Sequence, residues 1–237
     1  MKRQLAFFAM LGLLVSASSP ANAALSNGVL DNVAVGPQTL PTPVGWGVNS
    51  FLSTGPFADG ASSEQFANVL DPNGYGLFFK PFQGVATNKL TVDLYQNNPG
   101  TPGVNYTLTG WAGAEANYIG LSDPTVKSYF HLTFLGASSN ILSNVTLDLV
   151  AAGLGLGSPT PPASGFNYHP FSLSAIAPAG TVTVQAGAEM INAYGNPLGG
   201  GQAFVVDVFS LVPEPSAITL LALGIGGSLI LRRRNRA

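Results

Sequence analysis

Few residues of this 237-residue chain could do chemistry, and none of them falls in a recognisable catalytic pattern. The two histidines, His131 and His169, do not form a ligand-spaced pair, and isolated histidines are more often structural than catalytic. Glu64, Glu115 and Glu189 could act as glycosidase carboxylates, but no Gly-x-Ser-x-Gly elbow or phosphate-binding loop accompanies them. Since cysteine is also absent, thiol catalysis is excluded. We therefore expect a protein that is not an enzyme.

Aromatic side chains form the second group of interest. A sugar site presents flat aromatic faces to pyranose rings and places amides nearby for the hydroxyls. We predict Trp46, Tyr95 and Trp111 as glycan-binding residues, with Asn97 close to Tyr95 and with Tyr118 as a further candidate. The alternative is that the tryptophans belong to the core, since a tryptophan beside a strand is more often buried.

The charge of the central region, 24–211, limits its partners. Its 188 residues include ten acidic and three basic residues, a net charge of −7. Such a region repels nucleic acid and anionic membrane surfaces, so neither is an expected partner. It tolerates cations, calcium included.

Short stretches of alternating or apolar residues, separated by glycine- and proline-rich turns, must position these residues. We expect one all-β domain of eight to ten strands in a β-sandwich, because no stretch keeps a 3.6-residue period. The segment 64–70 could form a helical turn or a short strand, and 97–100 is expected to be a turn. The predicted strands cover 76–82, 89–95, 106–111, 129–135, 141–150, 171–176, 181–185 and 203–211, and the turn-rich region before them contains two short apolar pieces, 29–35 and 48–52.

The N-terminus has the three parts of a secretory signal peptide. Lys2 and Arg3 are followed by an apolar stretch, 5–15, and then by the small-x-small sequence Ala21-Asn22-Ala23. We predict a signal peptide over 1–23, and therefore export.

The C-terminus combines a polar motif, an apolar run and a basic end. Pro213 and Pro215 favour extended backbone in the motif, and 217–231 contains no charge. We predict a transmembrane helix over 217–231, held in the inner membrane with the arginines of 232–236 on the cytoplasmic side. Fifteen residues rise only about 22 Å against a hydrocarbon core of about 30 Å, so flanking residues must enter the interface.

The order Val212-Pro213-Glu214-Pro215-Ser216, apolar helix, arginine cluster resembles the PEP-CTERM sorting domain of bacteria with a two-membrane envelope. The resemblance covers 212–237 and implies processing by an exosortase-type membrane protease. It also implies delivery to the cell surface or to an exopolysaccharide matrix. The alternative is an ordinary single-pass anchor.

The segments 103–111, 178–184 and 203–211 resemble strands of galactose-binding-like jelly rolls and occur in the same order. The resemblance implies a jelly-roll-like sandwich. It also implies that Asp207, on the closing strand, helps hold a structural calcium, while the alternative is a solvent-facing aspartate. No other cofactor is expected.

The sequence therefore predicts an exported, non-catalytic surface or matrix protein, associated with exopolysaccharide and possessing a glycan-binding sandwich. The first alternative is a structural or adhesive protein that self-associates, and the second is a secreted glycan-active hydrolase.

Overall fold

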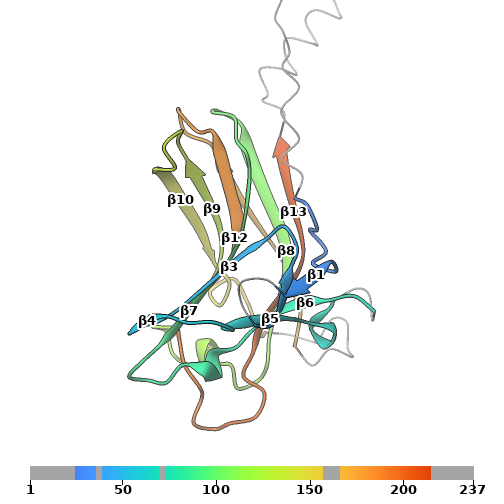
Figure 1. The fold of residues 1–237 in the computed structure, drawn as a ribbon, viewed down its shortest axis with the longest axis vertical. Coiled ribbons are helices and arrows are strands. Elements are labelled where there is room, and N and C mark those ends of the chain that lie inside the picture. The colour runs from blue at the N-terminus through green and yellow to red at the C-terminus, as the bar shows by residue number, and fades with distance from the viewer. Residues whose placement is uncertain (1–24, 36–38, 70–72, 157–165, 215–237) are drawn as a thin grey trace, which may run out of the picture.

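The computed structural model describes residues 25–35, 39–69, 73–156 and 166–214 (Figure 1). The predicted signal peptide and the apolar run 217–231 lie outside these residues. In the described part of the chain, no helix is long and apolar enough to cross a membrane. Its three helices are short 3-10 turns: η1 (Gln65–Ala67), η2 (Pro81–Gln83) and η3 (Ile119–Leu121).

The described chain is an all-β sandwich, as the sequence predicts. A six-stranded sheet has the order β10-β9-β12-β7-β3-β4, a five-stranded sheet has the order β11-β8-β13-β6-β5, and β1 pairs with β2. The strands are β1 (Val33–Val35), β2 (Pro41–Pro43), β3 (Gly47–Leu52), β4 (Gly55–Pro56), β5 (Ala61–Glu64), β6 (Gly76–Phe79), β7 (Leu90–Pro99), β8 (Asn105–Ala114), β9 (Lys127–Leu135), β10 (Ile141–Asp148), β11 (His169–Ile176), β12 (Thr183–Ala193) and β13 (Phe204–Glu214).

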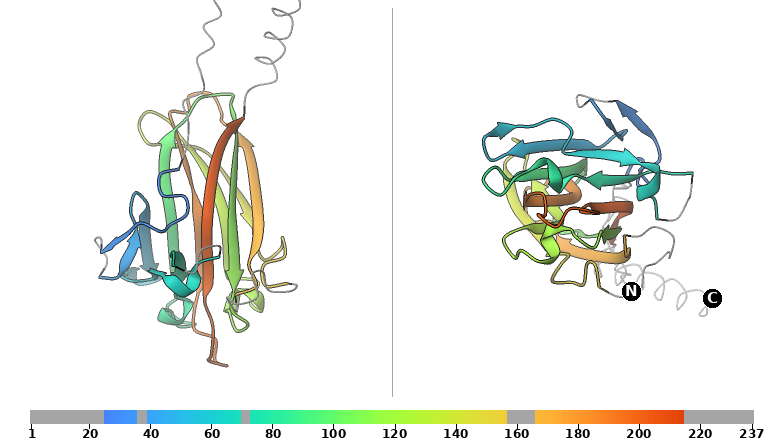
Figure 2. Two further views of the ribbon diagram at one scale, coloured as in Figure 1. Left: turned by 90° about the vertical axis from the view of Figure 1, so that its right-hand side faces the viewer. Right: turned by 90° about the horizontal axis from the view of Figure 1, so that it is seen from below.

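The chain passes repeatedly between the two sheets. Strand β7 belongs to the larger sheet, β8 to the smaller, β9 and β10 to the larger, β11 to the smaller, β12 to the larger and β13 to the smaller. All the pairings are antiparallel. Figure 2 shows the long strands running together along the molecule's longest axis, with the short N-terminal strands beside them.

Strand β7 shows how alternation in the sequence gives a strand with two different faces. Leu90, Val92 and Leu94 are fully buried, whereas Asp93 and Tyr95 between and after them are half-buried. The predicted strand 89–95 is confirmed, but β7 continues through the expected turn at 97–100 as far as Pro99. The reason is tertiary, because the backbone of this stretch pairs with β12 and outweighs the local turn preference.

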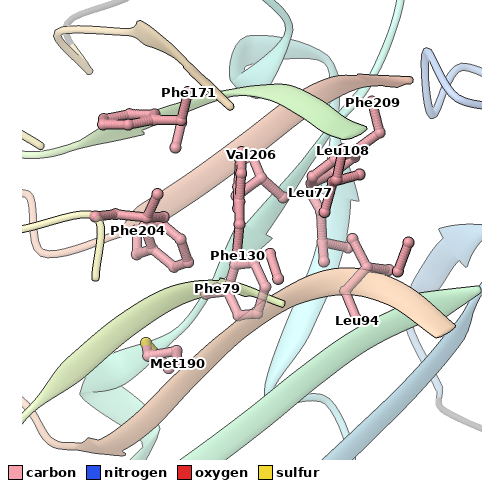
Figure 3. Close-up of a cluster of buried hydrophobic side chains, with 14 of the residues drawn as sticks. Leu77, Phe79, Leu94, Leu108, Phe130, Phe171, Met190, Phe204, Val206 and Phe209 are labelled. Atoms are coloured by element: carbon pink, nitrogen blue, oxygen red, sulfur yellow. The ribbon is translucent and has the colours of Figure 1, made fainter. Parts of the chain in front are cut away.

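The core fills the space between the sheets with aromatic and aliphatic side chains (Figure 3). Phe204 of β13 is fully buried in this core, and its ring centroid lies 4.9 Å from that of Phe79 and 5.9 Å from that of Tyr118. Phe130 of β9 contacts Phe209 of β13 across the sandwich at 5.2 Å. Because there are no cysteines, the fold depends on this apolar burial and on its strand pairing.

Replacement of Phe204 with alanine tests that dependence. Phe204 is fully buried, and removal of a buried phenylalanine ring typically costs about 3–5 kcal/mol in the free energy of unfolding. We expect Phe204→Ala to lower this free energy by about that amount in urea titration. The matched control is Phe51→Ala, at a ring that is 48% exposed, with an expected cost of about 1 kcal/mol or less. Equal costs for the two variants would contradict the proposed core.

Candidate functional site

The outer side of the six-stranded sheet is unusually rich in hydrogen-bonding groups. Its inner side chains form the core, and since side chains alternate along a strand, the intervening residues point outward. We call this surface the polar face. It is formed by Asn49 of β3, Asp93, Tyr95 and Asn97 of β7, Gln185 and Glu189 of β12, and Tyr129 of β9, together with His131 and Thr133 of β9, which are only 5% and 6% exposed.

Strand register places two carboxylates side by side on the polar face. Asp93 lies directly opposite Glu189, which in turn lies opposite Tyr129, and Asn49 lies opposite Asp93 on its other side. Burial raises the pKa of Glu189, and the neighbouring charge of Asp93 raises it further. The next-row histidine, His131, brings Nε2 within 3.0 Å of Asp93 Oδ1. The two carboxyl groups therefore have different surroundings.

Two glycines allow aromatic rings to lie across the polar face. The next row reads Gly47, Tyr95, Gly187 and His131 across four strands. A Cβ at position 47 would lie 2.4 Å from Tyr95 Cζ, and one at position 187 would lie 2.8 Å from His131 Nε2 and 1.8 Å from the carbonyl oxygen of Leu94. The Tyr95 ring therefore covers Gly47, and the His131 ring covers Gly187. Larger residues at either glycine would displace these rings.

A third row holds amides in fixed positions. Gln185 Nε2 donates to Asn97 Oδ1 at 3.1 Å, and Thr133 Oγ1 donates to Asn144 Oδ1 at 3.0 Å. Each amide still has other donor or acceptor positions available for a ligand. The polar face thus combines an aromatic ring, amides and carboxylates. This is the set of groups that can contact the apolar side and the hydroxyls of a sugar ring.

Only one of the three predicted glycan-binding residues lies on the polar face. Tyr95 is there, two residues before Asn97 on the same face of β7. Trp46 is 8% exposed, donates from Nε1 to the carbonyl oxygen of Asn27 at 3.0 Å and packs its ring against Phe209. Trp111 belongs to β8 in the other sheet, where it packs beside a buried cluster.

The sequence did not single out Asp93, Gln185 or His131 as members of one site. They are far apart in the chain, and each is an ordinary strand residue when read alone. The period-2 pattern of 89–95 predicts the strand itself, and the structure shows that Asp93 and Tyr95, two residues apart in β7, share its outer face. The other residues meet because β12 pairs with β7 and β9, and no local sequence pattern predicts that pairing.

Asp207 is fully buried rather than solvent-facing. Its Oδ2 accepts a hydrogen bond from the backbone N–H of Val69 at 2.8 Å, and its Oδ1 accepts one from Val208 at 2.7 Å. Burial raises the pKa of Asp207 to about 7, against the lowering effect of these two bonds, and the nearby charge of Asp31 adds to the rise. Asp31 itself accepts from the backbone N–H of Tyr75 at 2.7 Å.

The calcium predicted at Asp207 stays a prediction. The described residues contain no group of three His, Cys, Asp or Glu side chains that could hold a metal. Asp207 and Asp31 nevertheless suit a hard cation, because both are carboxylic acids and the charge of Asp31 lies close enough to raise the pKa of Asp207. In a calcium site, these two residues would supply the carboxylate oxygens, and the cation would neutralise their charge.

The residues that precede Pro215 continue the last strand. Val212–Glu214 pair with β8, three residues beyond the predicted end of the sandwich at 211. The Glu214 carboxylate accepts hydrogen bonds from Thr107 and Asn105, both at 2.8 Å, and these bonds lower the pKa of Glu214. Pro215 lies outside the described residues. The described part of the predicted sorting motif, Val212–Glu214, is thus extended and is hydrogen-bonded to the sandwich.

No protein-family profile and no curated protein matches this chain. Among solved structures, it is similar to the enzymatically active domain of tailspike protein 4 of bacteriophage CBA120, with 10% identity and a TM-score of 0.51. That match covers 82% of this chain and 22% of the tailspike chain, and it supports the sandwich fold alone.

Two carbohydrate-binding modules are also similar, at lower scores. TmCBM61, solved with beta-1,4-galactotriose, has 14% identity and a TM-score of 0.47, over 81% of this chain and 99% of that one. The CBM22-1 xylan-binding domain of Paenibacillus barcinonensis Xyn10C has 8% identity and a TM-score of 0.40, over 73% of this chain and 88% of that one.

The raised pKa of Asp207 predicts that stability falls as pH rises. The folded state holds the proton up to about pH 7, whereas the unfolded state releases it near the ordinary value of 3.8. The contribution of Asp207 to the free energy of unfolding is therefore complete below about pH 4. It is lost progressively up to about pH 7, and its total is about 4 kcal/mol. The pKa of Glu189 is also raised, so its contribution to stability likewise falls as pH rises. In chelator, we expect a lower melting temperature at pH 8 than at pH 5.

Two variants distinguish the contribution of Asp207 to this pH dependence from that of Glu189. Asp207→Asn should shrink the pH 5 to pH 8 difference, and Glu189→Gln should leave the Asp207 contribution in place. Calcium chloride at pH 8 should raise the melting temperature of the unaltered chain but not that of Asp207→Asn. A melting temperature in chelator that rises from pH 5 to pH 8 would contradict the buried, protonated Asp207.

Proposed function

We propose that this chain is an exported cell-surface or extracellular-matrix protein whose sandwich binds glycan through the polar face, without catalysis. The observation that carries the proposal is the Tyr95 ring lying across Gly47, with the groups of Asp93, His131 and the Gln185–Asn97 pair on the same face. A flat ring gives an apolar contact for a sugar, and the surrounding groups give partners for its hydroxyls.

The charge of the polar face points to the class of glycan. Asp93 and Glu189 lie at its centre. Lys127, at its margin, is paired with Asp148 through a 3.0 Å contact. A face of this kind favours neutral or amine-bearing sugars and repels uronic acids, because like charges raise the cost of association. The exopolysaccharide partner that we propose is therefore a neutral or amino-sugar polymer.

The proposed location rests on the two ends of the sequence. The signal-peptide pattern of 1–23 supports export. The motif, apolar run and arginine cluster of 212–237 support anchoring in the inner membrane, followed by processing by an exosortase-type protease and delivery to the surface or matrix. Cell fractionation with antibody against the sandwich tests this part independently of glycan binding.

Glycan binding is tested by removing the Tyr95 ring. A glycan array containing neutral β-linked oligosaccharides, chitosan oligomers and oligo-uronates should show binding to the first or second group and none to the third. We expect Tyr95→Ala to weaken binding to the best oligosaccharide by about tenfold or more, which corresponds to about 1.4 kcal/mol. Isothermal titration calorimetry measures this change.

The control for this experiment is Tyr75→Ala, a half-buried tyrosine that belongs to the loop before β6 in the other sheet. It should leave the affinity unchanged. Trp111→Phe, also in the other sheet, should have no effect either. Binding that survives Tyr95→Ala but is lost with either control would place the site elsewhere.

A second candidate function, glycoside hydrolysis, is favoured by one observation. Asp93 and Glu189 lie opposite each other, and the pKa of Glu189 is raised, which resembles the division between base and acid in a carboxylate pair. If the face hydrolyses glycan, Glu189→Gln should abolish turnover of the bound oligosaccharide, measured by reducing-end release, and preserve its affinity. Our non-catalytic proposal expects no turnover in the unaltered chain and a modest change in affinity.

A further inference from the structure

One end of the sandwich gathers several turns around the last residue of β13. Asn105 lies opposite both Ile176 and Glu214, and Thr183 lies opposite both Pro99 and Leu135. The segments 99–105, 135–142 and 176–183 therefore meet Glu214 at the same end, which is the upper end in Figure 1. We call these segments and Glu214 the C-terminal pole.

The C-terminal pole is uncharged apart from Glu214, and it exposes apolar side chains. Its three segments contain no Asp, Glu, Lys or Arg. Ile141 and Ile176 are 67% and 68% exposed, and Val182 is 46% exposed. The turn that contains Gly180 lies beside Leu142, since a Cβ at position 180 would be 3.8 Å from Leu142 Cδ1.

The opposite end of the molecule has a different composition. Lys89 and Asp123 lie there, linked through Tyr194, whose hydroxyl donates to Asp123 at 2.8 Å and whose ring lies 5.4 Å from Lys89 Nζ. Lys127 and Asp148 form an ion pair at the adjacent ends of β9 and β10. A sandwich that is acidic as a whole thus has one apolar end, at which Glu214 is the single charged residue of the pole.

The short link between Glu214 and the apolar run 217–231 indicates what lies next to this pole. Only Pro215 and Ser216 separate Glu214 from the apolar run 217–231. Three steps of at most about 3.6 Å put the pole within about 11 Å of the first apolar residue. The headgroup region adds only about 5–8 Å on each side of the hydrocarbon core. The run is also short, so its flanks are drawn toward the interface.

We propose that the C-terminal pole rests on the lipid surface into which the apolar run inserts, with Ile141, Ile176 and Val182 in the interfacial layer. The inference rests on the membrane anchoring in the proposed function. Apolar side chains gain free energy when they leave water at this layer, and the pole brings no lysine or carboxylate cluster into it. The acidic remainder of the sandwich, including the polar face, stays in water.

The absence of cysteine makes a direct test possible. Ile176→Cys and Val182→Cys are labelled with bimane in the full chain and reconstituted in phosphatidylcholine vesicles with nitroxide-labelled lipid. Leu198→Cys is the matched control, because Leu198 is 80% exposed and precedes β13 at the opposite end. We expect quenching at positions 176 and 182 at least twofold stronger than at position 198.

Three outcomes overturn the inference, and they are distinguishable. If the chain fails to float with the vesicles, the proposed anchoring fails and the pole has no surface to rest on. Flotation with equal quenching at the three positions retains the anchor but removes the contact between pole and lipid. If bis-maleimide joins two chains through Cys at position 176 and quenching there is weak, the pole binds a second copy instead.

Discussion

Strand β12 pairs with β7 on one side and with β9 on the other, and this double register determines which side chains meet across the larger sheet. A shift of one residue would turn Glu189 and Gln185 inward and bring Ala188 and Ala186 to the surface. The register is fixed because those alanines, with Val184 and Met190, are fully buried in the core. The hydrophobic interior therefore specifies the composition of the polar face on the other side of the same strands.

The parts of this arrangement that could be read from the sequence are those with a local pattern. Alternation over 89–95 predicts β7, and the predicted strand 129–135 corresponds closely to β9. The sequence predicts a strand over 181–185, whereas β12 begins at Thr183 and extends to Ala193. Its second half, with alanines and a glycine, has low strand preference, so only its position between two partners makes it a strand.

The tryptophans show that residue type alone does not identify a binding residue. Trp46 has the residue type expected of a sugar platform, yet its indole N–H is satisfied by Asn27 and its ring is enclosed by the core. Nothing in the neighbouring residues distinguishes an indole that faces a ligand from one that fills a gap. Gly47 and Gly187, which local reading treats as turn or bulge residues, are more informative, because each makes room for the ring of a residue distant in sequence.

The position of β13 has a mechanical consequence for a chain held by its C-terminus. The strand occupies the middle of the smaller sheet, and it pairs with β8 along most of its length as far as Glu214. Its ladder hydrogen bonds run perpendicular to the strand. Tension applied at Glu214 along β13 would load these bonds in shear, so that they share the force instead of opening one after another. A tether at this point would pull on the sandwich in its most resistant direction.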